Sequence, residues 1–365
     1  MRIQILALLL WPVLCAAVEI PDQGLSRQVR QTLGKERGSL QRKDFDGLRI
    51  LEADRKTITR LDGLGALHDL ELLQLANNQI TDLNPLRGLR HLDELDLRNN
   101  EIADLTPLAD LNSLRELYLQ TNKIRDLTPL AQLDYLRKLA LNGNPLQDIG
   151  PLANLVGLSQ LDLTQCGIRD LKPLSTLQTL THLNAATNQL EELDAVLELT
   201  RLSHLNIWGN RIHDLTPLAN LHQLHHLNLS ANQIADLNPL TNLHKLRTLR
   251  LDTNRITDLN PLADLRSLVE LRLADNQIKD LHSLSDLNLE ILDLTHNQIT
   301  DLDPLRTLEH LRILRLANNQ IADLEPLLKL QSLTILEIWR NPLSPAALGA
   351  QIPSLQARGV QVYYQ

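Results

Sequence analysis

Apolar residues follow one pattern along most of the chain. The pattern is L-x-x-L-x-L-x-x-N-x-I-x-D-L-x-P-L-x-x-L, and it returns every 22 residues, as in HLNIWGNRIHDLTPL from residue 204 and HLNLSANQIADLNPL from residue 226. The alternating leucines of L-x-L predict a short strand with one buried face. Because every unit repeats this strand, we expect the strands to stack in parallel over a leucine-filled interior, as in a solenoid.

An asparagine follows each predicted strand. Its column contains Asn78, Asn100, Asn122, Asn144, Asn188, Asn210, Asn232, Asn254, Asn276, Asn297, Asn319 and Asn341, and Lys56 and Cys166 fill the same slot in two further units, which makes fourteen units. A carboxamide can both donate to and accept from turn backbone that water cannot reach, so we expect a buried asparagine ladder. A small thiol tolerates burial in that slot, whereas a lysine predicts a half-exposed first coil.

The D-L-x-P-L segment predicts the opposite face of each coil. Aspartate caps backbone N–H groups at the start of a tight turn, and proline fixes φ without needing a donor. About ten residues run from this aspartate to the next strand, which leaves room for a turn or two of 3-10 helix but hardly for a full α-helix. Thin outer segments of this kind predict a curved horseshoe with the strands on its concave face.

The two ends of the chain depart from the repeat. Residues 1–17, MRIQILALLLWPVLCAA, indicate a secretory signal peptide that is cleaved after Ala17. We expect a helical N-terminal cap over residues 18–47, repeats over residues 48–342 and a C-terminal cap over residues 343–365.

Each cap has its own helix signals. Leu25, Val29 and Leu33 have helical spacing, and Gly34 is the expected stop. In the C-terminal cap we expect a helix from Ser344 to about Arg358, followed by an edge strand in VQVYY.

Composition narrows the class of protein. The net charge is −8 and no stretch is strongly basic, so binding to nucleic acid is not expected. No apolar segment beyond the signal is long enough to span a membrane. Cys15 leaves with the signal peptide, so Cys166 is not expected to form an intramolecular disulfide.

The repeated N-x-I-x-D-L-x-P-L unit and the IPDQGLSRQVRQTLGK cap resemble the internalin-type bacterial leucine-rich-repeat proteins. The resemblance covers essentially the whole mature chain. It implies a leucine-rich-repeat solenoid that binds a protein partner through its concave face. The end of the chain, SPAALGAQIPSLQARGVQVYY, is similar to the C-terminal cap of secreted bacterial proteins of this type. The wall-anchored members carry an immunoglobulin-like region and a sorting motif that this sequence lacks, so attachment to a Gram-positive wall is not expected.

Polar and aromatic side chains occupy the outward strand positions. His204, Asn206 and Trp208 lie six, four and two places before Asn210, and the neighbouring units carry the same histidine and asparagine columns. Aromatic and arginine side chains commonly anchor interfaces. We therefore expect a partner site centred on Trp208 and the histidine column, comprising Tyr118, His182, Asn184, His204, Asn206, Trp208, His226, Asn228, Arg250 and Arg272.

Charge around this site adds two expectations. Acidic residues toward Glu94 and basic residues toward Arg250 and Arg272 would orient a dipolar partner. Imidazoles with pKa values near ~6.5 would make binding depend on pH between roughly 5 and 7.

The histidine column also has to be considered as a metal site or as part of a catalytic site. Two adjacent imidazoles could share a zinc ion, but three collinear ligands form a poor tetrahedron, so neither a metal site nor a cofactor is expected. No Ser-His-Asp, Cys-His or glycine-rich phosphate motif remains once the repeat columns are set aside, so we do not expect an enzyme.

We expect a monomeric binding protein that is secreted or periplasmic. Two alternatives stay open. The first is a structural component of an extracellular or periplasmic assembly, with contacts through the sheet edge or the convex face. The second is a phosphatase-regulating repeat protein, against which the signal peptide and the D-L-x-P-L turns both argue.

Overall fold

Short parallel strands recur through the computed structural model of the protein, which describes residues 17–364. These residues fall into two units, one ending at Ile168 and the other beginning at Arg169. Apart from Ala17, the predicted signal peptide lies outside the described residues.

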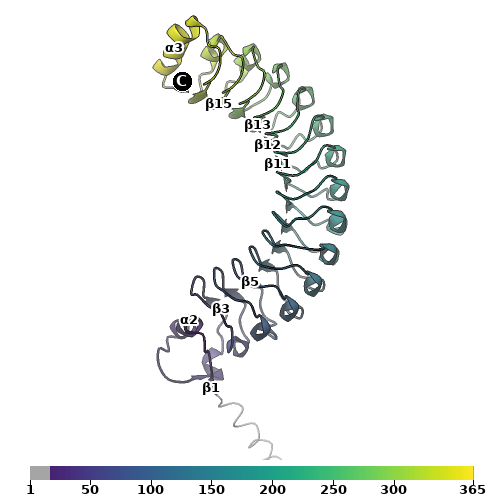
Figure 1. Ribbon diagram of the computed structural model, residues 1–365, viewed down its shortest axis with the longest axis vertical. Coiled ribbons are helices and arrows are strands. Elements are labelled where there is room, and N and C mark those ends of the chain that lie inside the picture. Colours follow the sequence, from purple (N-terminus) through teal and green to yellow (C-terminus); the bar gives the residue numbers. More distant parts are fainter. Residues whose placement is uncertain (1–16, 365) are drawn as a thin grey trace, which may run out of the picture. The chain divides into compact units, whose positions relative to one another are not determined.

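The first unit contains a parallel sheet whose strands follow one another in chain order. Its strands are β3 (Ile50–Glu52), β4 (Leu72–Gln74), β5 (Glu94–Asp96), β6 (Glu116–Tyr118), β7 (Lys138–Ala140) and β8 (Gln160–Asp162). Between the strands lie the 3-10 helices η2 (Leu64–Ala66), η3 (Asn84–Leu86), η4 (Thr106–Leu108), η5 (Thr128–Leu130) and η6 (Gly150–Asn154). The strands line one side of the coils and the helical turns line the other (Figure 1).

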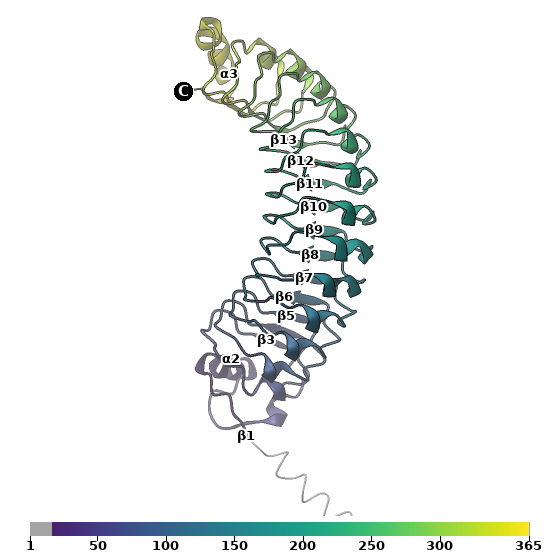
Figure 2. The same cartoon turned by 45° about the vertical axis from the view of Figure 1, so that its right-hand side comes forward.

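The second unit repeats this arrangement. Its strands are β9 (His182–Asn184), β10 (His204–Asn206), β11 (His226–Asn228), β12 (Thr248–Arg250), β13 (Glu270–Arg272), β14 (Ile291–Asp293), β15 (Ile313–Arg315), β16 (Ile335–Glu337) and β17 (Gln361–Tyr363). Its 3-10 helices are η7 (Lys172–Thr176), η8 (Asp194–Val196), η9 (Thr216–Leu218), η10 (Asn238–Leu240), η11 (Asn260–Leu262), η12 (His282–Leu284), η13 (Asp303–Thr307) and η14 (Glu325–Lys329). The turned view in Figure 2 separates the strands from the outer turns in both units.

The leucine pattern explains these elements. At β6 the alternating Leu117 and Leu119 are fully buried, whereas Glu116 and Tyr118, which precede them, point outward and are only half-buried. Burying one leucine side chain stabilises a fold by roughly 1.5–3 kcal/mol, so a column of such leucines dominates the stability of each unit. On the outer face Asp104 accepts a hydrogen bond from the N–H of Thr106 at 2.8 Å, which is the turn cap that the sequence predicts.

The asparagine ladder is confirmed. Asn122 is buried and donates from Nδ2 to the carbonyl oxygens of Leu97 and Leu119, each at 3.0 Å. Its Oδ1 accepts the N–H of Ile102 at 3.0 Å, so one side chain ties together two successive coils. The residue before it, Thr121, has a left-handed φ of 54°, a backbone turn that recurs in most coils and that the sequence reading missed.

The two exceptions in the asparagine column also behave as expected. Cys166 is 2% exposed, and its Sγ lies 3.3 Å from the carbonyl oxygen of Leu141. Burial raises the pKa of the Cys166 thiol to about 11, which disfavours the reactive thiolate. Lys56 is exposed at the first coil, and its N–H donates to Oδ1 of Asn78 at 3.0 Å.

A helix covers the start of the first unit. Helix α2 (Gln23–Leu33) begins after Asp22 and ends at Gly34, whose φ is 63°, as the leucine spacing and the glycine predict. One oxygen of Asp22 caps the N–H of Leu25 at 3.0 Å, and the other accepts the N–H of Thr59 at 2.9 Å. This carboxylate therefore joins the helix to the first coil. The antiparallel strands β1 (Ala17–Val18) and β2 (Leu40–Gln41) and the 3-10 helix η1 (Arg42–Phe45) were not expected.

The second unit ends in a helix and a strand, as expected. The helix contains a π-helical stretch, η15 (Ala347–Gln351), before α3 (Ile352–Ala357), and this stretch was not expected. Gly359 has a φ of 90°, and β17 then pairs with β16.

Candidate functional site on the strand face of the second unit

Strands β9, β10 and β11 bring three histidines into one row. The parallel register pairs His204 with His182 on one side and with His226 on the other. The rings of His182 and His204 stack with centroids 4.1 Å apart and an interplanar angle of 13°. Those of His204 and His226 are 4.4 Å apart at 20°. The predicted histidine column is thus a continuous stack of rings.

Hydroxyl groups beneath the stack orient its rings. The Ser203 hydroxyl donates to the carbonyl oxygen of Thr181 at 3.1 Å and lies 2.9 Å from Nδ1 of His204. Because a hydroxyl has one proton to donate, we assign the proton of this second contact to Nδ1 of His204. Its Nε2 then carries a lone pair.

The stack disfavours positive charge. Burial lowers the pKa of His204 to about 4, and the neighbouring His182, His226 and His225 add repulsion between like charges. Burial also lowers the pKa values of His182 and His226. The expectation of ordinary imidazole pKa values near 6.5 is therefore wrong for this column, and its titration is displaced toward more acidic pH.

The asparagines beside the stack serve the backbone as well as the surface. Oδ1 of Asn206 accepts the N–H of Trp208 at 3.2 Å, and Oδ1 of Asn228 accepts the N–H of Ser230 at 3.1 Å. Asn184 makes the same contact with the N–H of Ala186 at 3.3 Å. The oxygens of these side chains therefore fix the turn after each strand. Sequence reasoning had assigned them to the partner surface alone.

Trp208 stands on this turn as an exposed ring. Its side chain is 44% exposed, whereas Ile207 beside it is fully buried in the core. Gly209 follows with a left-handed φ of 69°, and a Cβ added there would lie 3.3 Å from Cγ2 of Thr187. The equivalent position has the same left-handed turn without a glycine in most other coils, as at Thr121 (φ 54°), so the turn beside the ring belongs to the repeat.

Arg250 and Arg272 lie on the neighbouring strands β12 and β13 and share one carboxylate. Glu270 is 3.1 Å from Arg250 and 2.6 Å from Arg272. Nearby, burial raises the pKa of Asp252, although the N–H of Ala274 and the hydroxyl of Ser230 stabilise its ionised form. The expected basic flank is therefore partly neutralised, so it offers a weaker field to a dipolar partner than the sequence suggests.

Tyr118 belongs to the first unit, on β6, and is not part of the histidine stack. Its hydroxyl donates to Glu116, and the guanidinium of Arg98 lies 5.8 Å from the centre of its ring. Burial and the adjacent Glu116 raise the pKa of the phenol. Tyr118 is thus held in a charged cluster of its own.

The geometry of the stack bears on metal binding. Nearly parallel rings direct their nitrogen lone pairs side by side, whereas a tetrahedral zinc ion needs lone pairs that converge. Within residues 17–364 no group of three or more histidine, cysteine, aspartate or glutamate side chains is arranged to hold a metal ion.

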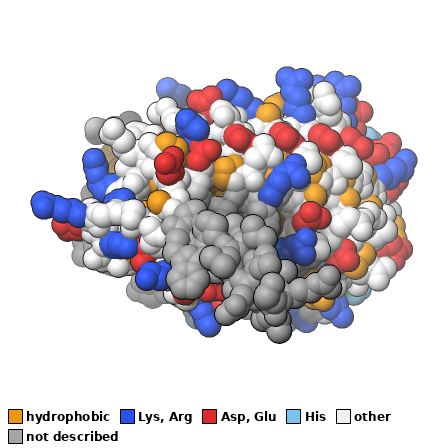
Figure 3. Space-filling model, turned by 90° about the horizontal axis from the view of Figure 1, so that it is seen from below, with side chains coloured by type: hydrophobic (Ala, Val, Ile, Leu, Met, Phe, Trp, Pro, Cys, Tyr) orange, Lys and Arg blue, Asp and Glu red, His pale blue; other side chains and the backbone are white. Residues whose placement is uncertain are grey.

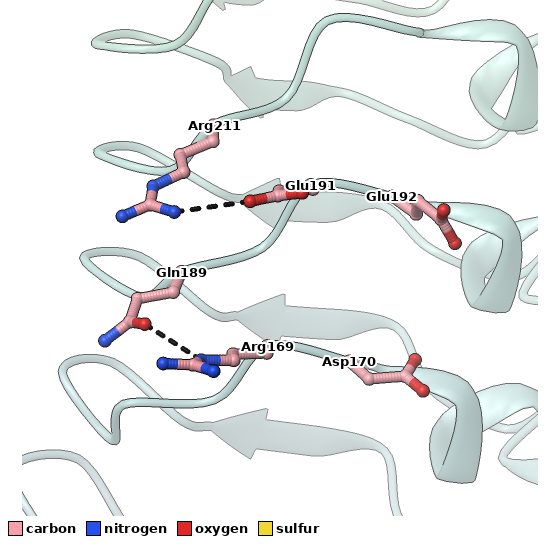
Figure 4. Close-up of a pocket in the computed structure, with 6 residues that line it drawn as sticks. All are labelled: Arg169, Asp170, Gln189, Glu191, Glu192 and Arg211. Atoms are coloured by element: carbon pink, nitrogen blue, oxygen red, sulfur yellow. Dashed lines mark hydrogen bonds and ion pairs between the residues drawn. The ribbon is translucent and has the colours of Figure 1, made fainter.

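Two surface features of the second unit escaped the sequence reading. Ile291, Ile313 and Ile335 occupy the same outward column as the histidines, further along the sheet, and are half-buried. The sequence signal for them was an apolar residue at an outward strand position. The second feature is an open polar hollow on the loops that follow the asparagine column (Figure 4), lined by Arg169, Asp170, Gln189, Glu191, Glu192 and Arg211.

Several side chains that line the polar hollow pair with one another. Arg169 donates to Gln189 at 3.0 Å, and Arg211 pairs with Glu191 at 3.3 Å (Figure 4). The sequence signal was the stretch EELDAV, which departs from the repeat at this coil.

Comparison with known proteins identifies the repeats. The family described as leucine-rich repeats (2 copies) matches residues 90–132, 222–264, 287–329 and 309–348, and a second leucine-rich-repeat family matches residues 244–299. The solved structure of an internalin (inlF) of Listeria monocytogenes is 32% identical, with a TM-score of 0.79, and the match covers 94% of this chain and 95% of that one. The chain belongs to the internalin family of bacterial leucine-rich-repeat proteins.

Two other structures resemble this internalin-type chain. A leucine-rich-repeat protein of Leptospira interrogans is 29% identical with a TM-score of 0.84, over 88% of this chain and 85% of that one. The functional domain of InlJ of Listeria monocytogenes is 23% identical with a TM-score of 0.78, over 94% and 81% of the two chains, and shows the shared fold. No curated protein matches the sequence.

The matches confirm the predicted leucine-rich-repeat solenoid. An internalin-like repeat fold suggests a protein-interaction module, and such modules are typically non-enzymatic. In the part of the chain that the structure describes, no helix is long and apolar enough to cross a bilayer.

Proposed function

We propose that the protein is a secreted or periplasmic binding protein that recognises a partner protein through the strand face of its second unit, without catalysing a reaction. The observation that carries this proposal is the 44% exposed ring of Trp208 beside the stacked imidazoles of His182, His204 and His226. A large ring on a rigid, leucine-backed sheet loses little freedom when a partner covers it, which is how aromatic anchors contribute to affinity.

The proposed export is based on the apolar segment at residues 1–17, which we interpret as a signal peptide. Cleavage after Ala17 would remove half of β1 and leave Val18 paired with Leu40 of β2. The mature chain would then comprise the caps and repeats at 18–47, 48–342 and 343–365. Mass spectrometry of the exported protein should find Val18 at its N-terminus, and an uncleaved chain in the cytoplasm would contradict this part of the proposal.

The binding step is tested by removing the anchor. After a partner is captured with the mature protein, we expect Trp208→Ala to weaken its affinity by about 2 kcal/mol or more, with little change in thermal stability. His204→Ala should also weaken binding. Isothermal titration calorimetry measures both effects.

A matched control is available on the same face. Trp339 lies in the last asparagine-bearing coil under the guanidinium of Arg340, 5.2 Å from its ring. Trp339→Ala should bind like the parent protein. The proposal fails if Trp208→Ala and His204→Ala both retain full affinity.

A structural role in an extracellular or periplasmic assembly is the second candidate. It is favoured by the end strand β17, on which Tyr363 is 54% exposed. Light scattering of the purified mature chain separates the two functions, because we expect a monomer for the binding protein and an oligomer for the assembly component.

A further inference from the structure

A hollow beside the strands of the first unit is lined by apolar side chains, by the carboxylates of Glu71, Asp93 and Glu94, and by Arg115. Strands β3, β4 and β5 are neighbours in the sheet, and their register places Ile50, Leu72 and Glu94 in one row across it. Tyr135, from the segment that leads into β7, lines the same hollow. The feature is separate from the histidine stack, which lies in the second unit.

The apolar walls are unusually open to water. Ile50 is 52% exposed and Tyr135 is 59% exposed. Leu72, on β4, is half-buried. None of these side chains points into the leucine core, so the core does not require them to be apolar. Large apolar side chains that gather around a surface hollow are typical of a contact site.

The carboxylates around the hollow differ in how they are neutralised. Asp93 pairs with Arg115 at 2.7 Å, and Glu71 pairs with Arg49 at 3.4 Å. Glu94 has no ion pair with any residue between 17 and 364. Its negative charge is the one that the hollow leaves without a partner.

Neighbouring groups make the charge of Glu94 costly. Burial raises its pKa, and the negative charges of Glu116 and Asp96 raise it further. Lys138 pairs with Glu116 at 2.7 Å, and its positive charge offsets the rise in the pKa of Glu94 only in part. A cation placed at Glu94 would relieve this repulsion.

We propose that this hollow binds a lysine or arginine side chain of a partner protein. The aliphatic stem of such a residue would lie along Ile50 and Leu72, and its cationic end would meet Glu94 on the side of the hollow that Tyr135 lines. Long basic side chains bury their stems on apolar surface in this way while their charged ends stay partly solvated. Contact with the tyrosine ring adds a cation–π attraction.

General attraction between charges has to be separated from this specific contact. The chain has a net charge of −8, so any basic peptide is drawn weakly to it. On the face drawn in Figure 3, basic side chains lie among acidic ones, several of which follow one another along the upper edge. A specific site should therefore respond to single substitutions in the hollow.

The test uses the full mature chain and fluorescein-labelled hexa-lysine, hexa-glutamate and glycine-serine hexapeptides at low salt. We expect hexa-lysine to bind and the other two peptides to bind far more weakly. Glu94→Gln and Tyr135→Ala should each weaken hexa-lysine binding by about fivefold, as fluorescence anisotropy would record. Glu309→Gln is the matched control, because it removes the same charge from an exposed position of the second unit.

The outcomes separate clearly. Equal binding by Glu94→Gln and the parent protein overturns the proposal, and so does an equal loss in Glu309→Gln, which would indicate attraction to net charge alone. Tight binding of hexa-glutamate or of the neutral peptide overturns it as well. A second readout is the pKa of Glu94 by carbon NMR, which should fall when hexa-lysine is added and stay constant if the hollow is not the site.

Discussion

The first outward strand position carries different chemistry in the two units. In the first unit this column contains Ile50, Leu72 and Glu94, and in the second unit it contains His182 and the two histidines that follow. The strands beneath have the same length and the same parallel register in both units. Leucine and asparagine columns thus hold the backbone constant while the residue type in this first outward column changes.

The two regions share one electrostatic feature with opposite sign. Around Glu94, burial and neighbouring carboxylates raise the pKa of an acid. Around His204, burial and neighbouring imidazoles lower the pKa of a base. Each region disfavours its own charge, because a repeated column places like groups side by side. A ligand of the opposite charge would reverse either shift.

The largest expected effect comes from removing the N-terminal cap of the first unit. Deleting residues 18–47 takes away helix α2 and the Asp22 carboxylate that joins it to Thr59. Leucines of the first coil would then meet water, so we expect aggregation or stepwise melting. Calorimetry and light scattering measure this. A truncated chain that stays monomeric and equally stable would show that the coils do not need their cap.

The next effect contrasts an inward asparagine with an outward one. Asn122→Ala leaves the buried N–H of Ile102 without its acceptor and removes one of the two amide donors to each of the carbonyls of Leu97 and Leu119, so it should lower the free energy of unfolding by about 3 kcal/mol. Asn206→Ala loses one turn contact and should cost about 1 kcal/mol or less. Urea denaturation of both variants gives the comparison, and similar losses would refute the distinction between columns.

A smaller effect is expected at Cys166. Cys166→Ser should cost about 1 kcal/mol, because a hydroxyl can still contact the turn, and Cys166→Leu should cost more through overpacking. The buried thiol, with its pKa raised to about 11, should react slowly with a thiol reagent in the native protein. Rapid labelling without denaturant would contradict its placement.

The smallest effect concerns pH. The pKa of His204 is about 4 in the folded chain and ~6.5 when unfolded, so the unfolded state takes up a proton first as pH falls. This histidine therefore has no effect on stability above pH ~6.5 and lowers the free energy of unfolding as pH falls from ~6.5 toward 4. His204→Gln should lose less stability than the parent between pH 7 and 4.5, as denaturation curves would reveal.

The exposed His310 provides the control for this comparison. His310→Gln should follow the parent curve, since that ring is not part of the stack. If His204→Gln and the parent protein lose equal stability on acidification, the stack does not hold the pKa of His204 down.

Much of the fold could be predicted from the sequence because its determinants are local and repeated. The L-x-L spacing, the asparagine slot and the D-L-x-P-L turn each act within one coil or between adjacent coils, so a period of 22 residues is sufficient to place them. Helix α2 followed from the spacing of Leu25 and Val29 and from Gly34 for the same reason.

The chemistry of the outward face depended on tertiary structure. The sequence alone determined that His204, Trp208 and Arg250 point away from the leucines. Only the packed coils decided that the histidine rings stack, that Arg250 shares Glu270 with Arg272, and that Glu94 forms no ion pair within residues 17–364. These outcomes depend on the rotamers and charges of side chains that are distant in sequence and adjacent in space. Periodicity sets which column a side chain belongs to, and the neighbouring coils set its contacts and its charge.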